Sequence, residues 1–453
     1  MATLDTLLTD LIAEVTRIQA PDALSSKDGD SFSMPGLIAT GDGRSIATSR
    51  EMERLIEAVA QELKGSDPSI SQRYTDKEWN WLVRGTFGPA LMIIDLDDDP
   101  AHNAQRVLAS IRSQIDAAVT AQARENAFGC TLFGTFNVAP FAIGPVSFEP
   151  RSDWLTRKQH DGEITNTTAR RVRQSWRGAK LRRRKAGYDA IREKDILDAV
   201  GKCPYVCTVR TKGLAPEASR LKAQTASHLA MAAVALRWSR PSEALAGFRL
   251  LTDPGIRRQR SLVFVPGVRI LAGAQLVGMP HGPSISAEDW LAELEENRDG
   301  FALIGQAIDY FLNVSGVTAR PKIMNAIVQA LLWFYEACRE EVDLMAVVKF
   351  TATLDALAAG GKSGGIRRLV NARLGIQDDK PIRKDGPTLK AAVDEIYSDG
   401  RSRTIHGTND KLGKDWSSTR RLAEQFARLC LITSVGWAAE NPSIDNPAAL
   451  QKN

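Results

Sequence analysis

Residues 321–338 read PKIMNAIVQALLWFYEAC, and this stretch decides the fold of the C-terminal third of the chain. Proline suits the first position of a helix, where the N–H group that it lacks would have no intrahelical partner. The apolar residues that follow recur at the spacing of one helix face, namely Ile323, Ile327, Leu331, Phe334 and Cys338. The pattern predicts a helix that begins at Pro321 and buries one stripe of side chains.

The rest of the C-terminal region repeats this helical pattern and lacks the alternation that is typical of strands. Further helices are predicted over residues 342–358, 365–374, 387–404 and 416–439. Gly360 and Gly361 end the first of them, as glycine commonly does. Successive helices without a strand predict an α-helical bundle.

The first 300 residues mix the two kinds of pattern. Helices are predicted over residues 3–18, 51–63, 102–124 and 216–238, strands over 90–95, 130–138, 146–148, 205–209, 248–251 and 261–265, and a loop over 21–48. The predicted class is therefore α+β. A mixed α/β region of one or two subdomains, residues 1–300, precedes an all-α bundle, residues 301–453, with the boundary near residues 290–305.

The composition is that of an ordinary globular protein, with 453 residues of which 43% are hydrophobic and 25% charged. No apolar run approaches the ~18 residues of a membrane span, and Met1 to Glu14 carry acids rather than the early basic cluster of a secretory signal. The five cysteines are scattered. Cys203 and Cys207 lack a second pair for zinc and are expected to pack in the core. A reduced cytoplasmic location is the simplest interpretation.

The positive charge is concentrated in one segment, residues 170–185, which holds nine basic residues and no acid. The rest of the chain has 50 basic and 54 acidic residues. The candidates for RNA contact are Arg170, Arg171, Arg173, Trp176, Arg177, Lys180, Arg182, Arg183, Arg184 and Lys185. Such a strip suits a phosphate backbone, with Trp176 available for base stacking. The alternative is a solvated basic helix face.

The strongest candidate for chemistry is the run Arg401-Ser402-Arg403-Thr404-Ile405-His406, followed by Gly407. Arginine grips phosphate oxygens with a planar fork, and histidine transfers protons near neutral pH. Cleavage of RNA without a metal needs both roles, because a base must activate the ribose 2′-hydroxyl and a cation must stabilise the charge on phosphorus.

The C-terminal region, residues 300–440, resembles the HEPN superfamily and in particular its Apea-like branch. Arg401-Ser402-x3-His406-Gly407 is similar to the Arg-polar-x3-His signature of that family. Ile396-Tyr397 is similar to an aliphatic-tyrosine pair of the branch, and Thr353 to Leu357 to its helix with an acid in an apolar face. One departure is Asp399-Gly400, which is expected to kink the helix or to make it restart at the motif.

The resemblance implies an endoribonuclease that acts as a homodimer or higher homo-oligomer, with two motifs meeting in one cleft. His406 is the candidate for proton transfer and Arg401 for the phosphate clamp. Ser402 would orient the scissile phosphate, Arg403 would make a second phosphate contact, and Tyr397 would support the site. Neither a metal nor another cofactor is expected. The implied setting is anti-phage defence or toxin-like growth arrest, controlled by a trigger or an antidote protein.

Asp355 shares a predicted helix stripe with Leu344, Val348 and Thr351, so it is expected to face the bundle. A carboxylate there needs a partner, and Arg401 and His406 are both candidates. The alternative places Asp355 at a frayed helix end in water.

Two other functions remain open at this stage. The bundle is either catalytic or a non-catalytic module for dimerisation and for binding nucleic acid or protein. A metal-dependent nuclease would instead use Asp95, Asp97, Asp98 and Asp99 after the predicted strand. Gly360 to Gly364 lacks the spacing of a phosphate-binding loop. The remaining histidines, His102, His160, His228 and His281, lack suitably spaced acids and are expected to be structural or on the surface.

Overall fold

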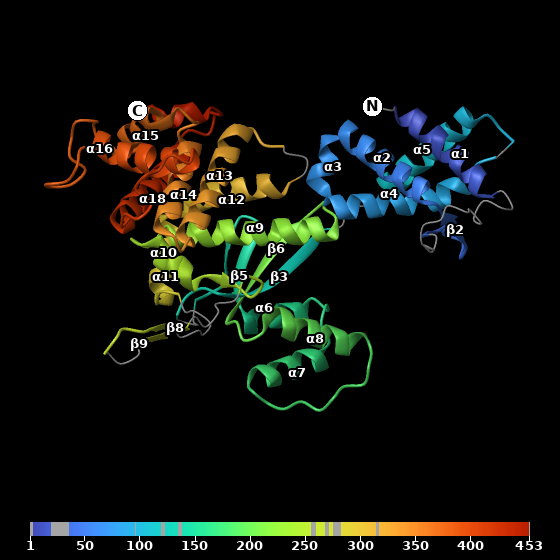
Figure 1. The fold of residues 1–453 in the computed structure, drawn as a ribbon. Helices are drawn as coiled ribbons and strands as arrows, with labels where there is room; N and C mark the ends of the chain where they lie inside the picture. The colour runs from blue at the N-terminus through green and yellow to red at the C-terminus, as the bar shows by residue number, and fades with distance from the viewer. Residues whose placement is uncertain are drawn as a thin grey trace. The chain divides into compact units, whose positions relative to one another are not determined.

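A computed structural model describes residues 3–19, 36–95, 97–118, 123–134, 138–254, 260–267, 271–274, 282–313 and 317–452. It confirms the α+β class, with many helices and small sheets (Figure 1). The contacts divide the chain into two compact units, one of Met1–Arg124 with Thr211–Lys222 and one of Glu125–Arg210 with Ala223–Asn453. The main boundary between the two units therefore falls near residue 124 and not near residues 290–305, where it was expected.

The first unit is a group of helices around its own apolar core. Its helices are α1 (Leu4–Gln19), α2 (Arg50–Ser66), α3 (Pro68–Arg73), α4 (Asp76–Leu91) and α5 (Pro100–Ala118). Side-chain caps fix where two of them begin. Ser49 accepts a hydrogen bond from the N–H of Met52 at 3.0 Å before α2, and Thr75 with Glu78 forms a capping box before α4.

Two predictions in this unit were wrong. The predicted loop contains a hairpin of β1 (Gly36–Ala39) and β2 (Ser45–Thr48), whose turn places Gly41 and Gly43 at φ of 88° and 89°. Residues 21–35 of that loop lie outside the described residues. The strand predicted over 90–95 is absent from the described residues, because its apolar start is the last buried turn of α4. The helix predicted over 102–124 is α5, and residues 119–122 lie outside the description.

The second unit is built on a five-stranded sheet with the order β4-β5-β6-β3-β7. The strands are β3 (Arg124–Thr131), β4 (Phe141–Ile143), β5 (Val146–Pro150), β6 (Tyr205–Thr211) and β7 (Arg249–Leu250). The predicted strands over 146–148, 205–209 and 248–251 are confirmed. A separate hairpin pairs β8 (Arg260–Val263) with β9 (Leu271–Ala274), which confirms most of the strand predicted over 261–265.

The strand predicted over residues 130–138 was placed too late in the sequence. The observed strand ends at Thr131, and Leu132 and Phe133 are buried after it, outside the strand. Residues 135–137 lie outside the description.

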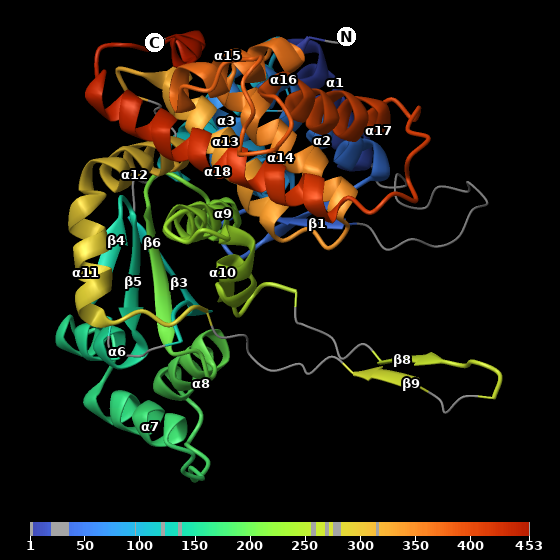
Figure 2. The same cartoon turned by 90° about the vertical axis from the view of Figure 1, so that its left-hand side faces the viewer.

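Helices of the second unit lie at both ends of the strands (Figure 2). Those at one end are α6 (Arg151–His160), α7 (Asn166–Trp176) and α8 (Tyr188–Val200), and those beside the sheet are α9 (Pro216–Ala235), α10 (Pro241–Gly247) and α11 (Ala287–Glu296). The bundle at the other end begins with α12 (Arg298–Leu312), α13 (Pro321–Cys338), α14 (Asp343–Leu357) and α15 (Lys362–Leu374). It ends with α18 (Ser417–Glu440) and the short 3₁₀ helix η3 (Pro447–Gln451).

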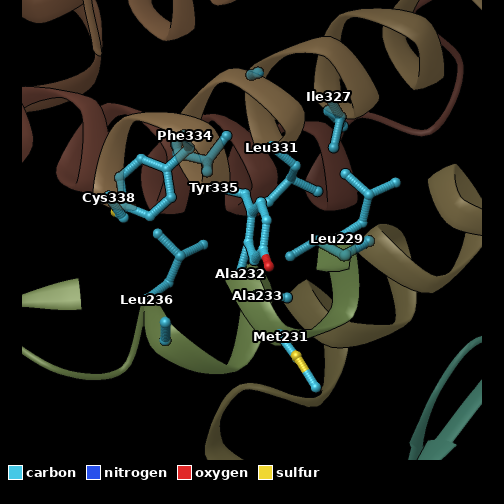
Figure 3. Packing of buried hydrophobic residues seen from close by; sticks show 14 of the residues in the cluster. Leu229, Met231, Ala232, Ala233, Leu236, Ile327, Leu331, Phe334, Tyr335 and Cys338 are labelled. Atoms are coloured by element: carbon cyan, nitrogen blue, oxygen red, sulfur yellow. The ribbon is translucent and has the colours of Figure 1, made fainter. Parts of the chain in front are cut away.

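One core joins the sheet layer to the bundle, which is why no division falls near residues 290–305. Leu229 and Ala232 of α9, with Leu236 just after it, pack against α13. Their neighbours there are Leu331, Phe334 and Tyr335 (Figure 3). The predicted helix beginning at Pro321 is confirmed. Within the described part of the chain, no single helix is long and apolar enough to cross a membrane, and only the bent pair of α14 and α15 reaches that length and composition together.

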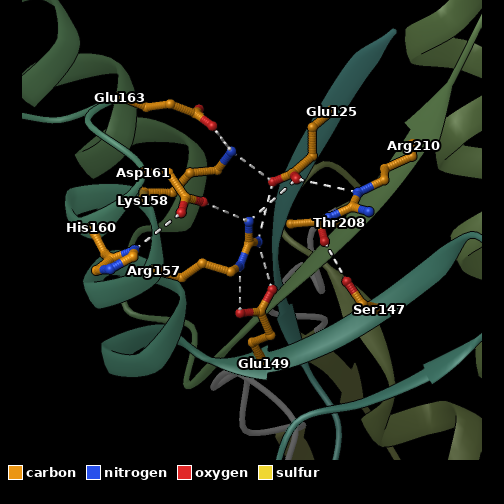
Figure 4. A network of polar contacts seen from close by, with 10 residues as sticks. All are labelled: Glu125, Ser147, Glu149, Arg157, Lys158, His160, Asp161, Glu163, Thr208 and Arg210. Carbon is orange, nitrogen blue, oxygen red and sulfur yellow. Dashed lines mark hydrogen bonds and ion pairs between the residues drawn. The ribbon is translucent and has the colours of Figure 1, made fainter.

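A network of charged side chains fixes α6 to the sheet (Figure 4). Arg157 lies 2.7 Å from Glu149 and 3.3 Å from Glu125, and the buried Lys158 lies 3.0 Å from Glu125. Arg210 of β6 lies farther from Glu125, at 3.9 Å. Burial tends to raise the pKa of Glu125, but hydrogen bonds from Lys158 and Arg157 outweigh it, so the pKa is lowered.

This network predicts a loss of stability in acid. A carboxyl whose folded pKa is lowered contributes stability above its ordinary pKa of 4.5 and loses that contribution as the pH falls further. We therefore expect the free energy of unfolding to decline below about pH 4.5. Denaturant titrations from pH 3 to 7 would measure it. The variant Glu125→Gln should be less stable at pH 7 and less sensitive to acid, and an unchanged acid response in this variant would contradict the assignment.

Candidate active site

The predicted motif lies on one helical rod with three segments. They are α16 (Leu389–Val393), the π-helix η2 (Asp394–Ser402) and a single α-helical turn, α17 (Arg403–Ile405). The helix predicted over 387–404 thus begins two residues late, behind the capping side chain of Thr388. The helix does not break at Asp399-Gly400, because the π-helix continues through both residues and α17 follows it directly at Arg403. Such π segments are rare and frequently occur at functional sites.

Gly400 explains how η2 comes close to α14, the helix that carries Asp355. A Cβ atom placed on Gly400 would lie only 2.7 Å from Cγ1 of Val347. Val347 is fully buried, so it has little room to move. The absence of a side chain at residue 400 therefore lets the motif helix pack directly on α14.

We expect Gly400→Ala to lower the free energy of unfolding by about 1–3 kcal/mol, because the added methyl group overpacks the contact with Val347. Chemical denaturation of both proteins would measure the change. Gly436→Ala, on α18, is a matched control, since a Cβ atom at that position meets nothing within 4 Å. Equal stability of the Gly400 variant and the parent would contradict the close approach.

Arg401 is held by two neighbours on its inner side. Its Nη1 donates to the hydroxyl of Tyr397 at 3.2 Å, and its Cζ lies 5.3 Å from the centre of that ring. Its Nη2 lies 3.6 Å from Oδ2 of Asp355. Both charged side chains are mostly buried, with exposed fractions of 26% and 22%. The structure therefore places Arg401, rather than His406, beside Asp355, and Asp355 lies within α14 rather than at a frayed end.

This pair leaves polar atoms unused. Nε of Arg401 and Oδ1 of Asp355 are buried and have no hydrogen-bond partner in the described part of the protein. Buried polar groups are nearly always satisfied, so such atoms point to water or to a ligand. An anionic oxygen is the natural acceptor for the free N–H of Arg401.

His406 follows α17 directly and is exposed. Gly407 has a φ of 71° and donates to the carbonyl of Thr404 at 3.3 Å, while Thr408 donates to that of Arg403 at 2.9 Å. These two bonds form a Schellman motif, in which glycine adopts the left-handed conformation. The glycine of the sequence motif thus ends the helix and leaves the imidazole in solvent. The side chain of His406 makes no hydrogen bond or ion pair with any of the described residues.

Ser402 and Arg403 have different surroundings. Ser402 is half-buried, and its carbonyl accepts from the N–H of His406 at 3.0 Å. The guanidinium of Arg403 lies 3.5 Å from carboxylates of both Asp399 and Asp410. Arg403 is therefore already paired, which weakens its candidacy as a phosphate contact.

Residues that sequence analysis missed fasten the loop after His406 to η2. Lys411 lies 2.8 Å from Asp399, and Lys414 lies 2.6 Å from Glu395. The hydrogen bond from Lys411 is the main reason that the pKa of Asp399 is lowered. No short-range pattern could have found these pairs, because their members lie 12 and 19 residues apart.

The basic segment divides into paired and displayed residues. Arg171 lies 2.7 Å from Glu193, Arg184 lies 2.6 Å from Asp189, and Arg173 donates to Gln159 at 3.0 Å. The exposed members without a described side-chain partner are Arg170, Arg177, Lys180, Arg182, Arg183 and Lys185. The segment is not one helix face, since α7 ends at Trp176. It lies at the opposite end of the strands from the bundle, so the chain does not bring it together with the motif (Figure 2).

The other candidate residues have structural surroundings. Asp98 lies 3.1 Å from Arg106, and no group of three or more His, Cys, Asp or Glu among the described residues is arranged to hold a metal. Cys203 and Cys207 are buried, as expected for core packing. Acid partners do occur for His102, His160 and His228, and that of His228 is Asp253, at 2.8 Å. His281 lies outside the described residues.

Comparison of the chain with models of protein families, with curated proteins and with solved structures finds no match.

Proposed function

We propose that the chain is a metal-independent endoribonuclease of HEPN type. The observation that carries the proposal is the half-satisfied pair of Arg401, on the π-helix η2, and Asp355, on α14. An arginine fixed on one side and free on the other suits a clamp for a phosphate oxygen. The exposed imidazole of His406 follows directly after the same rod, and an imidazole can donate or accept a proton near neutral pH.

The proposed reaction is an attack by the ribose 2′-oxygen on the adjacent phosphorus. A base takes the proton of the 2′-hydroxyl, the new oxygen–phosphorus bond forms, and the bond from phosphorus to the 5′-oxygen breaks. An acid supplies the proton of the departing 5′-oxygen. Arg401 stabilises the charge on the phosphoryl oxygens. The products end in a 2′,3′-cyclic phosphate and a 5′-hydroxyl.

One His406 cannot be base and acid at once. We therefore propose a homodimer or higher homo-oligomer in which two copies of the motif supply both groups. By resemblance, the setting is anti-phage defence or toxin-like growth arrest in the cytoplasm, with a trigger or antidote protein that controls the activity.

The test is to incubate the purified chain with mixed RNA in EDTA and to analyse the new ends. Cyclic-phosphate ends formed in EDTA support the proposal. Cleavage that disappears in EDTA would favour a metal-dependent nuclease. Binding of RNA without cleavage would favour the second candidate function, a non-catalytic binding module. The contacts of Arg401 with Asp355 and Tyr397 are the observation that favours this second candidate, because the same contacts would brace a purely structural bundle.

A further inference from the structure

The loop that joins α7 to α8, residues 177–187, is fixed to both helices by arginines. Arg171 donates from Nη2 to the carbonyl of Arg182 at 2.9 Å and from Nε to Glu193 at 2.7 Å. Arg184 donates to the hydroxyl of Thr168 at 2.9 Å. Glu193 is buried, and the hydrogen bond from Arg171 is the main cause of its lowered pKa. These two arginines therefore hold the loop in one shape.

The fixed loop and the helix before it, α7, display positive charges and no negative charge. Residues 166–187 contain no acid, and Asp189 and Glu193 of α8 are already paired with Arg184 and Arg171. The exposed cations are Arg170, Arg177, Lys180, Arg182, Arg183 and Lys185. Holding like charges close together costs free energy, which a bound polyanion would offset.

The surface is also concave. A hollow of about 430 Å³ lies between α7, the loop of residues 177–187 and α8. Its charged lining residues are Arg171, Arg182, Arg183, Arg184 and Lys194, with the acids Glu193 and Asp198, so cations are in excess. Cations in a hollow of this kind can approach a phosphate from more than one side.

The surface offers one exposed aromatic ring, that of Tyr188, which is 69% exposed. The ring of Trp176 lies 4.9 Å from Cζ of Arg151, and its indole nitrogen is buried. The ring of Tyr188 lies 5.3 Å from Cζ of Arg192, and its hydroxyl also contacts that residue. Single strands are held largely by successive bases that stack on several aromatic side chains, and one exposed ring provides a single such contact. A duplex instead presents its phosphates and keeps its bases paired.

We propose that the displayed cations of residues 170–185 dock the helical part of a folded RNA through its backbone phosphates, without reading its sequence. This inference rests on the proposed function for the choice of RNA. Because the surface and the motif lie at opposite ends of the strands, a substrate would engage both only if it were long and folded (Figure 2). A short single strand would reach the motif alone.

The test uses the full chain with His406→Ala, so that binding is measured without cleavage. The probes are an RNA duplex of about 30 base pairs, an unstructured RNA of about 30 nucleotides and vesicles that contain phosphatidylserine. The triple variant Arg182→Gln, Arg183→Gln and Lys185→Gln is compared with Arg50→Gln, Lys77→Gln and Arg112→Gln, which removes the same charge from exposed residues of the other unit.

We expect the first triple variant to weaken duplex binding about tenfold or more and to reduce the dependence of log K on log salt by about two to three units, while the control changes neither. Binding of the single strand should be weak and unaffected. Equal effects of the two triple variants would overturn the proposal. Tighter binding of the single strand than of the duplex would do the same, as would loss of vesicle binding with duplex binding retained.

Cleavage distinguishes a failure of this inference from a failure of the proposed function. With His406 present, the triple variant should cut the short single strand at the parent rate and the folded RNA more slowly. If no RNA is cut by any form but duplex binding responds as expected, the docking surface stands and the ribonuclease does not. If the short strand is cut but the triple variant binds the duplex as tightly as the parent does, the ribonuclease stands and the docking surface does not.

Discussion

His406→Ala should reduce RNA cleavage in EDTA by a factor of at least about 10²–10⁴, the usual contribution of general acid–base catalysis. Two copies of the imidazole would be lost in an oligomer, so the loss should lie at the upper end. Stability should not change, because the side chain is exposed and bonds to none of the described residues. Cleavage of a labelled RNA and denaturant unfolding would measure the two effects separately.

The matched control is His160→Ala. This imidazole is 90% exposed, and its only described charged neighbour is Asp161, at 3.5 Å. The control should cut RNA at the parent rate. If His406→Ala did so as well, proton transfer by this residue would be excluded and the helical bundle would keep only a binding role.

Arg401 should respond differently, because it has structural contacts as well. Arg401→Ala removes the proposed clamp, which should cost about 10²–10³ in rate, and it also leaves Asp355 without its cation. Arg401→Lys keeps a charge but loses the planar fork that reaches Tyr397 and Asp355 together. Partial recovery of stability without recovery of cleavage in the lysine variant would separate the two roles.

Much of the fold could be predicted because local patterns agree with the final packing. The apolar stripe of residues 323–338 is buried as a face of α13, and Pro321 begins that helix. The strand over 205–209 was predicted from a short apolar run, and it is a buried inner strand of the sheet. Helical and strand periodicity decide such elements because one face must be buried.

Errors arose where one short apolar run fits two structures. Residues 90–95 begin with the end of α4, and a run of this length cannot distinguish the last turn of a helix from a strand. The division of the chain was not predicted either, because it depends on α9 packing against α13, about 100 residues later in the sequence.

The residues of the candidate site could be predicted from the sequence, but the contacts among them could not. Asp355 was assigned two candidate partners, and only the packing of η2 on α14 selects Arg401. The π-helix has no sequence signal apart from Gly400, which was interpreted as a break. Arg171 and Arg184 look like their neighbours in sequence, yet acids on α8 make them structural.

The largest expected effect on stability comes from Asp253, which sequence analysis did not single out. Its side chain is 4% exposed and lies between the imidazole of His228 and the guanidinium of Arg339. Oδ1 lies 2.8 Å from Nε2 of His228, and Oδ2 lies 3.0 Å from Nη1 of Arg339. The N–H of Leu250 also donates to Oδ2, at 3.1 Å. Burial opposes the charge of this carboxyl, but the hydrogen bond from His228 and the nearby Arg339 lower its pKa.

Removing this carboxylate should leave Arg339 nearly buried without a counter-ion, since that side chain is 16% exposed. Among the described residues, Arg339 would keep its bond to the hydroxyl of Tyr335, at 2.6 Å, and its contact with that ring, whose centre lies 5.3 Å from Cζ. Breaking a buried ion pair on one side costs about 3–5 kcal/mol, so Asp253→Ala should lower the free energy of unfolding by about that amount. Denaturant unfolding followed by tryptophan fluorescence would measure it.

Two further variants show whether the charge is responsible. Asp253→Asn keeps an oxygen for the N–H of Leu250 but not the negative charge, so most of the loss should remain if charge dominates. Glu243→Gln, in a pair whose two side chains are 67% and 65% exposed, should produce no measurable change. A loss in Asp253→Asn no larger than in Glu243→Gln would mean that His228 and Arg339 are stabilised by their packing on Tyr335 rather than by this carboxylate.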